Sequence, residues 1–148
     1  MKKPTYKELY AFLKDVDSSF PVPISKKQDL ELLAKKLLEK ATLVSVWHYE
    51  EMVALVAGYT ENVVDNMAYI SVLATRQEAR GHGYAKDVVQ RFLQICRDKK
   101  LSAVHLYAVP TNLPAVYLYK SLGFVEYKIE NEPRKEDLHL IYYIKKGN

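Results

Sequence analysis

The chain has 148 residues, and we expect residues 1–148 to form a single domain. Hydrophobic residues make up 49% and charged residues 27%; the net charge of +4 comes from scattered lysines, which argues against nucleic-acid binding. No apolar run approaches the roughly 20 residues of a membrane span, and no apolar segment follows the basic start, so neither membrane insertion nor a signal peptide is expected. The single cysteine, Cys96, allows no internal disulfide and indicates a cytoplasmic protein.

Two helices are predicted at the start of the chain, each introduced by a capping box. The box at Thr5 predicts a helix over 6–15, and the box at Ser25 predicts a second helix over 26–40. The segment 17–23 between them contains two prolines and is expected to be a loop.

The middle of the chain is rich in β-branched and aromatic residues, which predict strands. Runs over 42–49 and 52–60 indicate a hairpin, and a third strand is predicted over 67–75. The later elements are expected to be a helix over 85–99, a strand over 102–109, a short helix closed by Gly123, and strands over 124–130 and 138–145. The strands that flank the third helix need a crossover and therefore a parallel pairing, so the order ααβββαβαββ predicts a mixed sheet with helices on both faces.

A glycine-rich loop lies between the third strand and the third helix: Arg80-Gly81-His82-Gly83-Tyr84-Ala85. Glycines at a strand-to-helix junction leave N–H groups free near the positive end of the helix dipole, which suits a phosphate. The loop lacks the Gly-Lys-Ser/Thr ending of a P-loop, and Lys86 stands where a dinucleotide fingerprint needs its third glycine. On its own, the loop is equally consistent with a turn that simply begins a helix.

A second motif runs from Asn112 to Phe124, and with it the chain resembles the GCN5-related N-acetyltransferase (GNAT) family, which transfers acyl groups from coenzyme A. The resemblance covers about Thr42 to Lys145. The residues that match the two family motifs are Arg80, Gly83, Ala85, Asn112, Ala115, Leu118, Tyr119, Gly123 and Phe124. The resemblance implies an α/β (α+β) fold with a mixed, mostly antiparallel sheet of six to seven strands and about four helices. The family's usual first strand is not evident in residues 2–5.

The resemblance also implies a cofactor site. The backbone of Arg80, Gly81, His82, Gly83, Tyr84 and Ala85 would bind the pyrophosphate of acetyl-coenzyme A. The pantetheine arm would lie between the strand that ends Val72-Leu73-Ala74 and the strand containing 106–108, with an N–H near Leu73 holding the oxyanion. Asn112 would cap the short helix and contact the pantetheine arm. Tyr119 would protonate the departing thiolate.

The sequence does not identify the general base. Many family members carry a Glu on the strand before the loop, but this strand holds Tyr69 and Ser71 and no acid. The alternatives are water or one of Glu50, Glu51, Asp65, His48 and His105. No cluster of His, Cys, Asp or Glu has metal-ligand spacing, so no metal is expected.

The resemblance therefore implies an N-acetyltransferase that moves an acetyl or longer acyl group to a primary amine of a small molecule. The segment 17–25 and the hairpin tip near Glu50 are expected to select the acceptor. The pattern from Phe12 to Pro23 is similar to acetyltransferases encoded with bacterial surface-polysaccharide enzymes, which suggests an amino sugar. The alternatives are a protein or peptide acetyltransferase and a non-catalytic coenzyme A-binding module. We expect a monomer or a homodimer.

Overall fold

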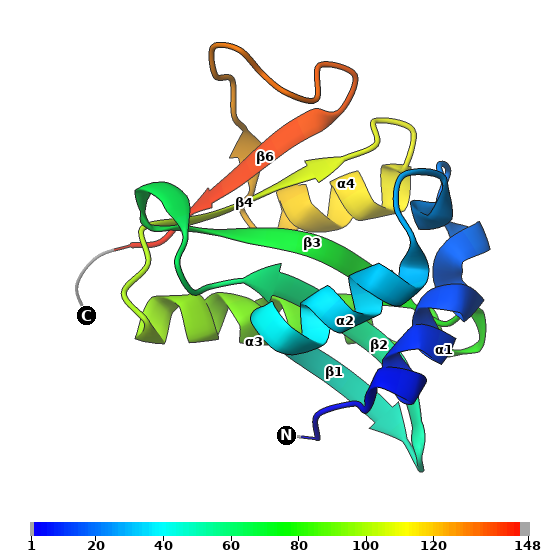
Figure 1. The fold of residues 1–148 in the computed structure, drawn as a ribbon. Coiled ribbons are helices and arrows are strands. Elements are labelled where there is room, and N and C mark those ends of the chain that lie inside the picture. Colours follow the sequence, from blue (N-terminus) through cyan, green and yellow to red (C-terminus); the bar gives the residue numbers. More distant parts are fainter. Residues whose placement is uncertain (1, 146–148) are drawn as a thin grey trace.

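The computed structural model describes residues 2–145, and a six-stranded sheet of order β1-β2-β3-β4-β6-β5 forms its centre (Figure 1). The strands are β1 (Thr42–His48), β2 (Glu51–Tyr59), β3 (Met67–Thr75), β4 (Ala103–Ala108), β5 (Val125–Glu126) and β6 (Leu138–Tyr143). Strands β3 and β4 pair in parallel, and every other neighbouring pair is antiparallel. The predicted mixed, mostly antiparallel sheet is confirmed with six strands, and residues 2–5 form no strand.

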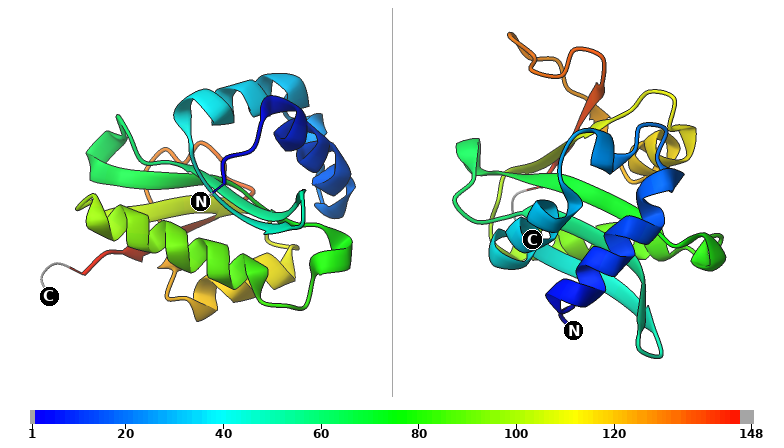
Figure 2. Two further views of the ribbon diagram at one scale, coloured as in Figure 1. Left: turned by 90° about the horizontal axis from the view of Figure 1, so that it is seen from below. Right: turned by 45° about the vertical axis from the view of Figure 1, so that its right-hand side comes forward.

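Four α-helices cover the two faces of the sheet (Figure 2). They are α1 (Tyr6–Val16), α2 (Leu30–Lys40), α3 (Tyr84–Asp98) and α4 (Leu113–Ser121). Helices α1 and α2 pack on one face, whereas α3 and α4 pack on the other. The predicted element order is therefore confirmed. None of the described helices combines the length and the apolarity that a membrane crossing requires.

The two N-terminal helices begin differently from one another. The capping box of α1 is present: the Glu8 N–H donates to Thr5 Oγ1 (3.1 Å), and the Thr5 N–H donates to Glu8 Oε1 (2.9 Å). The predicted box at Ser25 is wrong, because Asp29 caps α2 by accepting the Leu32 N–H (3.1 Å). An aspartate is as good an N-cap as a serine, and Asp29 directly precedes the apolar run of the helix.

The core has one layer on each side of the sheet, and β2 contributes to both. Residues 52–57 of β2 are all buried, because α3 packs on one face of the strand and α1 and α2 on the other. At Gly58 the ring of Phe92 from α3 comes so close that an added Cβ would lie 2.5 Å from it. Glycine is therefore required at this position for the helix to approach the sheet.

The parallel pairing of β3 and β4 is short. It is limited to Met67–Tyr69 against 103–105, and beyond Tyr69 and His105 the two strands are not paired with each other. Each strand keeps its antiparallel neighbour on the other side, β2 for β3 and β6 for β4. A split therefore opens in the middle of the sheet.

The strand predicted over 124–130 is much shorter in the structure, where β5 covers Val125–Glu126. One further backbone bond, from the Tyr127 N–H to the His139 carbonyl (2.8 Å), follows it. The chain then turns through Asn131, whose φ of 56° is left-handed. Residues 127–137 thus form a loop between β5 and β6, and Glu132 in this loop is hydrogen-bonded to Tyr107 of β4 and His139 of β6.

Candidate active site

The glycine loop forms an open backbone cradle at the start of α3. Gly81 and Gly83 have φ values of 82° and 78°, and no heavy atom lies within 4 Å of where a Cβ would stand on either. Gly83 occupies the N-cap position of α3, so the first N–H groups of the helix adjoin the loop. The Arg80 side chain ties the loop to the end of β3 through the Thr75 carbonyl (3.3 Å). These features fit a diphosphate, since backbone N–H groups and the helix dipole both favour an anion.

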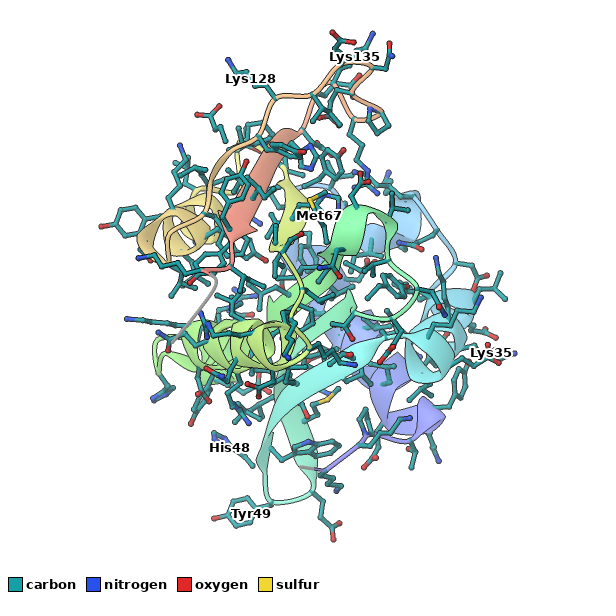
Figure 3. The ribbon with its side chains drawn as sticks, turned by 90° about the vertical axis from the view of Figure 1, so that its left-hand side faces the viewer. Lys35, His48, Tyr49, Met67, Lys128 and Lys135 are labelled. Atoms are coloured by element: carbon teal, nitrogen blue, oxygen red, sulfur yellow. The ribbon has the colours of Figure 1, made fainter. Side chains whose placement is uncertain are left out.

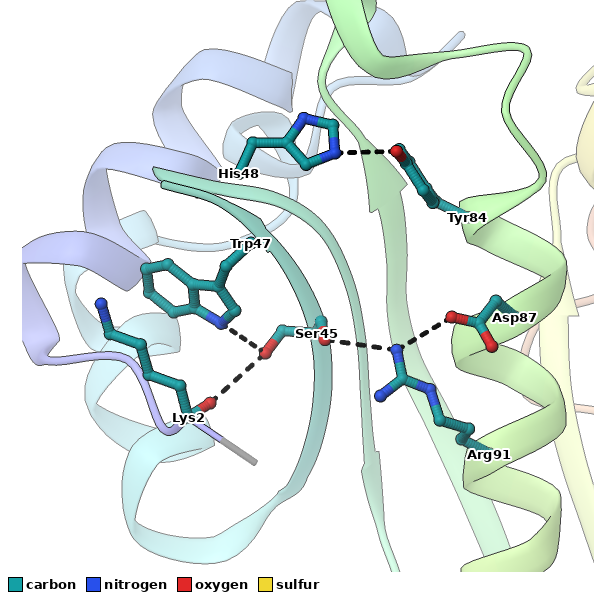
Figure 4. Close-up of polar contacts among 7 residues, drawn as sticks. All are labelled: Lys2, Ser45, Trp47, His48, Tyr84, Asp87 and Arg91. Atoms are coloured by element: carbon teal, nitrogen blue, oxygen red, sulfur yellow. Dashed lines mark hydrogen bonds and ion pairs between the residues drawn. The ribbon is translucent and has the colours of Figure 1, made fainter. Parts of the chain in front are cut away.

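An aromatic cluster flanks this loop. His48 Nε2 lies 2.7 Å from Tyr84 Oη (Figure 4), and the ring of His82 stacks on that of Tyr84 with 5.6 Å between centroids. His48 stands with Tyr49 at the tip of the β1–β2 hairpin (Figure 3). The structure therefore places His48 beside the loop that the sequence assigns to the pyrophosphate.

The first cavity, of about 390 Å³, fills the split in the sheet. Val72 and Leu73 line it from β3, and Asn112 and Tyr119 line it from the α4 side. Segment 20–28 lines it from the opposite face of the sheet, so the cavity crosses the sheet through the gap. Among the predicted cofactor-binding residues, Ala74 and the loop residues from Arg80 to Ala85 are not part of this lining.

Tyr119 is held in place by the core while it faces the cavity. Only 5% of the residue is exposed, and its ring meets Phe124 edge-on with 5.2 Å between centroids. Burial, and secondarily the nearby Tyr69, raises the pKa of the Tyr119 phenol well above 10. The phenol is therefore neutral, and able to donate a proton, throughout the neutral range. Tyr117, two residues earlier on the same helix, is 78% exposed.

Asn112 takes the N-cap position of α4, but its side chain makes no capping hydrogen bond there. The position was predicted correctly, whereas the predicted capping role of the side chain is wrong. Pro114 in the first turn of α4 carries no N–H and removes one of the donors that a cap would satisfy. Asn112 is instead one of the residues that line the first cavity.

The segment between α1 and α2 covers the first cavity and is fixed by polar contacts. Asp17 accepts the N–H of Ser25 (2.9 Å) and its hydroxyl proton (2.5 Å), which closes the loop on itself. Lys27 lies 3.9 Å from Asp137, which leads into β6. The loop expected to select the acceptor therefore borders the cavity together with the segment 127–137.

A second cavity, of about 900 Å³, adjoins the first on the α2 side of the sheet. Four residues line both cavities: Lys36, Tyr59, Tyr69 and Tyr107. Tyr59 Oη is buried there and has no hydrogen-bond partner among the described residues. Volumes of this size suit small-molecule ligands.

The two cavities distinguish among the candidate bases. Glu50, Glu51 and His48 lie at the hairpin tip and line neither cavity, and Glu51 pairs with Arg76 at 4.0 Å. Asp65 and His105 both line the second cavity. The hairpin tip therefore does not border the space where an acceptor could meet the split.

His105 belongs to a hydrogen-bonded cluster that the sequence analysis missed. His105 Nδ1 lies 2.8 Å from His139 Nε2, and His139 Nδ1 lies 2.8 Å from Glu132 Oε2. Glu132 Oε1 also accepts the hydroxyl proton of Tyr107. His139 and Tyr107 are register partners on β6 and β4, and their rings stack at 4.2 Å. The sequence signal that could have revealed the cluster is the histidine and tyrosine on one strand, His105 and Tyr107, opposite a histidine on a strand that could pair with it, His139.

The cluster shifts the acidity of its members in opposite directions. Burial, and secondarily His139, lowers the pKa of His105 below its usual 6.5. Burial raises the pKa of Tyr107, as does its bond to Glu132. For Glu132, partial desolvation is outweighed by the bonds from Tyr107 and His139, so the pKa of this carboxyl falls below its usual value. At neutral pH the cluster thus pairs a carboxylate with neutral His105.

No group of three or more His, Cys, Asp or Glu side chains in residues 2–145 is arranged to hold a metal ion.

Solved structures of acetyltransferases have the same fold. PaiA N-acetyltransferase from Thermoplasma acidophilum, in complex with coenzyme A, matches with a TM-score of 0.76 at 12% identity over 97% of each chain. An aminoglycoside 6'-acetyltransferase type Ii gives 0.76 at 11% identity, over 96% of this chain and 92% of that one. The ribosomal-protein-S18-alanine N-acetyltransferase from Escherichia coli gives 0.71 at 15% identity, over 95% and 87%.

The sequence itself places the chain in a family. A mycothiol acetyltransferase of Thermomonospora curvata is 35% identical over 66 residues, which are 45% of this chain and 22% of that protein, so the match spans a small part of its length. The model of the "Acetyltransferase (GNAT) family" matches residues 9–124, which include both the glycine loop and the motif from Asn112 to Phe124. The chain therefore belongs to the acetyltransferase (GNAT) family.

Proposed function

We propose that this protein transfers the acetyl group of acetyl-coenzyme A to a primary amine of a small-molecule acceptor. The observation that carries the proposal is the split between β3 and β4, which the buried Tyr119 reaches from one face and the segment 20–28 from the other. Family membership supports the donor, and the open backbone at Gly81 and Gly83 fits its diphosphate.

Each predicted site residue has a role in this proposal. The backbone from Arg80 to Ala85 holds the pyrophosphate. The pantetheine arm lies along Val72, Leu73 and Ala74, where β3 has no strand partner on the split side, and its amides pair with the free backbone groups. Asn112 contributes its carboxamide to the arm, and an N–H near Leu73 stabilises the oxyanion.

Tyr119 serves as the general acid. When the amine attacks the thioester carbon and the C–S bond breaks, the phenol gives its proton to the leaving sulfur. A neutral phenol in a buried position suits this role, because it stays protonated until the thiolate forms.

The acceptor is proposed to be a small amine, with an amino sugar as the leading class. The two cavities are lined by aromatic rings, and together they open from the split beneath the loop 17–25. One structural neighbour is named for an aminoglycoside acceptor and the sequence relative for mycothiol. Another neighbour is named for a ribosomal-protein alanine, so a peptide belongs among the acceptors to be tested.

The decisive experiment is an acceptor screen that detects the free thiol of coenzyme A. D-glucosamine, spermidine and a peptide with a free N-terminus represent the competing acceptor classes. Calorimetry with acetyl-coenzyme A is run alongside. Binding without thiol release from any amine would favour a coenzyme A-binding module, and absence of binding would refute the proposal.

Tyr119→Phe tests the assigned acid. We expect kcat to fall by about 10²–10⁴-fold, because the substitution removes the proton donor and little else. Affinity for acetyl-coenzyme A, measured by calorimetry, should stay close to that of the wild type. Tyr117→Phe is the matched control, since this exposed tyrosine lies on the same helix. An unchanged kcat in Tyr119→Phe would remove the role.

A further inference from the structure

The chain lacks an acid on the strand before the glycine loop, so the proton that an amine must lose needs another destination. Most primary amines are protonated at neutral pH, with a pKa of about 10, and a protonated amine cannot attack a thioester. We propose that His105 takes this proton and passes its own to His139, which Glu132 holds ready as a positioning residue. This inference rests on the proposed acetyltransferase function.

The position of His105 carries the first step of the argument. It is paired with Tyr69 at the last register position before β3 and β4 separate, so it stands at the closed end of the split. The rings of Tyr69 and His105 lie 5.2 Å apart, and Tyr69 lines both cavities. Tyr119 also lines the first cavity, and His105 lines the second. A ligand that bridges the two cavities is therefore bounded by His105 on one side and by Tyr119 on the other.

The hydrogen bonds fix the direction in which a proton can travel. Glu132 is an acceptor, so His139 donates from Nδ1 to Glu132 Oε2. His139 Nε2 then carries a lone pair and accepts the Nδ1 proton of His105. This tautomer leaves His105 Nε2 as the nitrogen with a lone pair available to a ligand in the second cavity.

The step balances without any further reactant. One N–H bond of the ammonium group breaks, and its proton forms the Nε2–H bond of His105. The Nδ1 proton of His105 moves to His139 Nε2, and the resulting imidazolium is paired with the Glu132 carboxylate. The neutral amine then attacks the thioester. The nitrogen then loses a second proton, which returns to Tyr119 and replaces the proton that Tyr119 gives to the sulfur. After the product leaves, the relay returns its own proton to solvent.

Burial supports a relay in preference to a solvated surface pair. The side chains of His139 and Glu132 are 3% and 18% exposed. A positive charge on His139 would be unfavourable at such a site without its carboxylate, which is hydrogen-bonded to it. Tyr107 donates to the other oxygen of that carboxylate and so keeps it oriented.

Other charged and titratable groups surround the relay and contribute to its pH dependence. Arg134 lies over the Tyr107 ring at 5.2 Å and favours nearby negative charge, and the Tyr127 ring meets His139 at 5.0 Å. The remaining titratable groups that line the second cavity are Lys36, Glu39, Lys40, Tyr59, Glu61, Asp65 and Tyr69. None of these is hydrogen-bonded to His105 or His139 in residues 2–145.

His105→Gln tests the relay through the pH profile of kcat/KM with the amine that the acceptor screen identifies. In the wild type we expect an acid limb below pH 6.5, because His105 must be neutral to accept a proton. The variant should lose about 10²–10⁴-fold at pH 7 and lose that limb. The loss of kcat/KM in the variant should be smaller at a pH above the pKa of the amine, because the acceptor is already neutral there. If the role of His105 were only structural, the variant would lose the same factor in kcat/KM at every pH.

Glu132→Gln keeps the shape of the carboxyl group and removes its charge. Because Glu132 raises the pKa of His105, the acid limb should move to lower pH and the plateau should fall about tenfold. Tyr143→Phe is the control on the same strand as His139; this tyrosine is 59% exposed and should leave the profile unchanged.

A readout without substrate separates this inference from the proposed function. Long-range ¹H–¹⁵N spectra of the four histidines of the free protein report ring tautomers and titration. We expect neutral His105 and His139 to carry their proton on Nδ1, and the titration of His105 to move to lower pH in Glu132→Gln. The other tautomer at His105, or a titration of His105 that this substitution leaves unchanged, would overturn the relay even if the enzyme is active. The expected tautomers and shift in a protein that acetylates no amine would instead count against the proposed function.

Discussion

The two halves of the candidate site use different parts of the chain. The proposed donor half consists mostly of backbone: the loop from Arg80 to Ala85 and the unpaired edge of β3 present N–H and C=O groups. The acceptor half consists of side chains from distant segments: His105 on β4, His139 on β6, and Glu132 in the segment before β6. The donor half lies in two continuous stretches, whereas the acceptor half exists only when β4 and β6 pair.

This difference has a chemical reason. Phosphates and amides are recognised by backbone geometry, which needs glycines and a helix start at fixed spacing. Proton transfer needs side chains of suitable acidity, and their partners are supplied by the fold instead of by neighbours in sequence. We therefore expect substitutions in the two halves to separate donor binding from acceptor chemistry.

Apart from substitutions of Tyr119 and His105, which move protons, the largest effect on one half alone should come from Gly83→Val. A β-branched residue at a φ of 78° costs about 1–2 kcal/mol, and its side chain would occupy the open cradle. We expect the Kd for acetyl-coenzyme A, measured by calorimetry, to rise by about 5–30-fold. The KM for the amine should change little. Gly83→Asn is the matched variant, because asparagine tolerates the left-handed region and should retain more affinity; equal affinity in both would contradict the backbone argument.

Phe20→Ala should produce the opposite pattern. Phe20 is partly buried and lines the first cavity from the loop between α1 and α2. Removing its ring should lower kcat/KM for the amine roughly tenfold, while the Kd for acetyl-coenzyme A stays within about twofold. Val22→Ala, on the same loop but 40% exposed, should have a smaller effect. A loss of donor affinity in Phe20→Ala would mean that the loop belongs to the donor half.

The smallest effect is on stability, and it tests whether Glu132 is charged in the folded protein. Its folded pKa lies below the unfolded value of 4.5, so it stabilises the protein above pH 4.5, and this contribution is lost as the pH falls through the folded pKa. At pH 7 the wild type should have a higher urea midpoint than Glu132→Gln. At acidic pH, below the folded pKa, the difference should vanish. A constant difference at all pH values would show that shape, and not charge, is responsible.

Much of the fold could be predicted from sequence because the signals are local. The hairpin, the crossover helix α3 and the turn at Gly123 depend on alternation, helical spacing and a left-handed glycine. The errors came where two local signals compete: Ser25 and Asp29 are both good caps, and the structure uses the one next to the apolar run. In place of the predicted strand over 124–130, β5 is short and is followed by a loop whose Glu132 bonds to β4 and β6, contacts that no local pattern encodes.

The site divides in the same way. Asn112 and Tyr119 could be assigned because the whole motif around them is continuous, and the structure places both on the first cavity. His105 could be named only as one candidate among several. Its partner His139 and the acid Glu132 stayed unidentified, since nothing in the sequence near His105 indicates a bond to residues more than 25 positions away.

The three-residue pairing of β3 and β4 has a consequence for local stability. Backbone hydrogen bonding across the sheet is interrupted there, so β1–β2–β3 and β4–β6–β5 are two half-sheets joined by a short seam and by the helices packed across it. Units joined in this way open separately in native-state hydrogen exchange. We expect a donor bound along the seam to replace the missing strand-to-strand bonds, so that the substrate itself completes the sheet and its two halves open together.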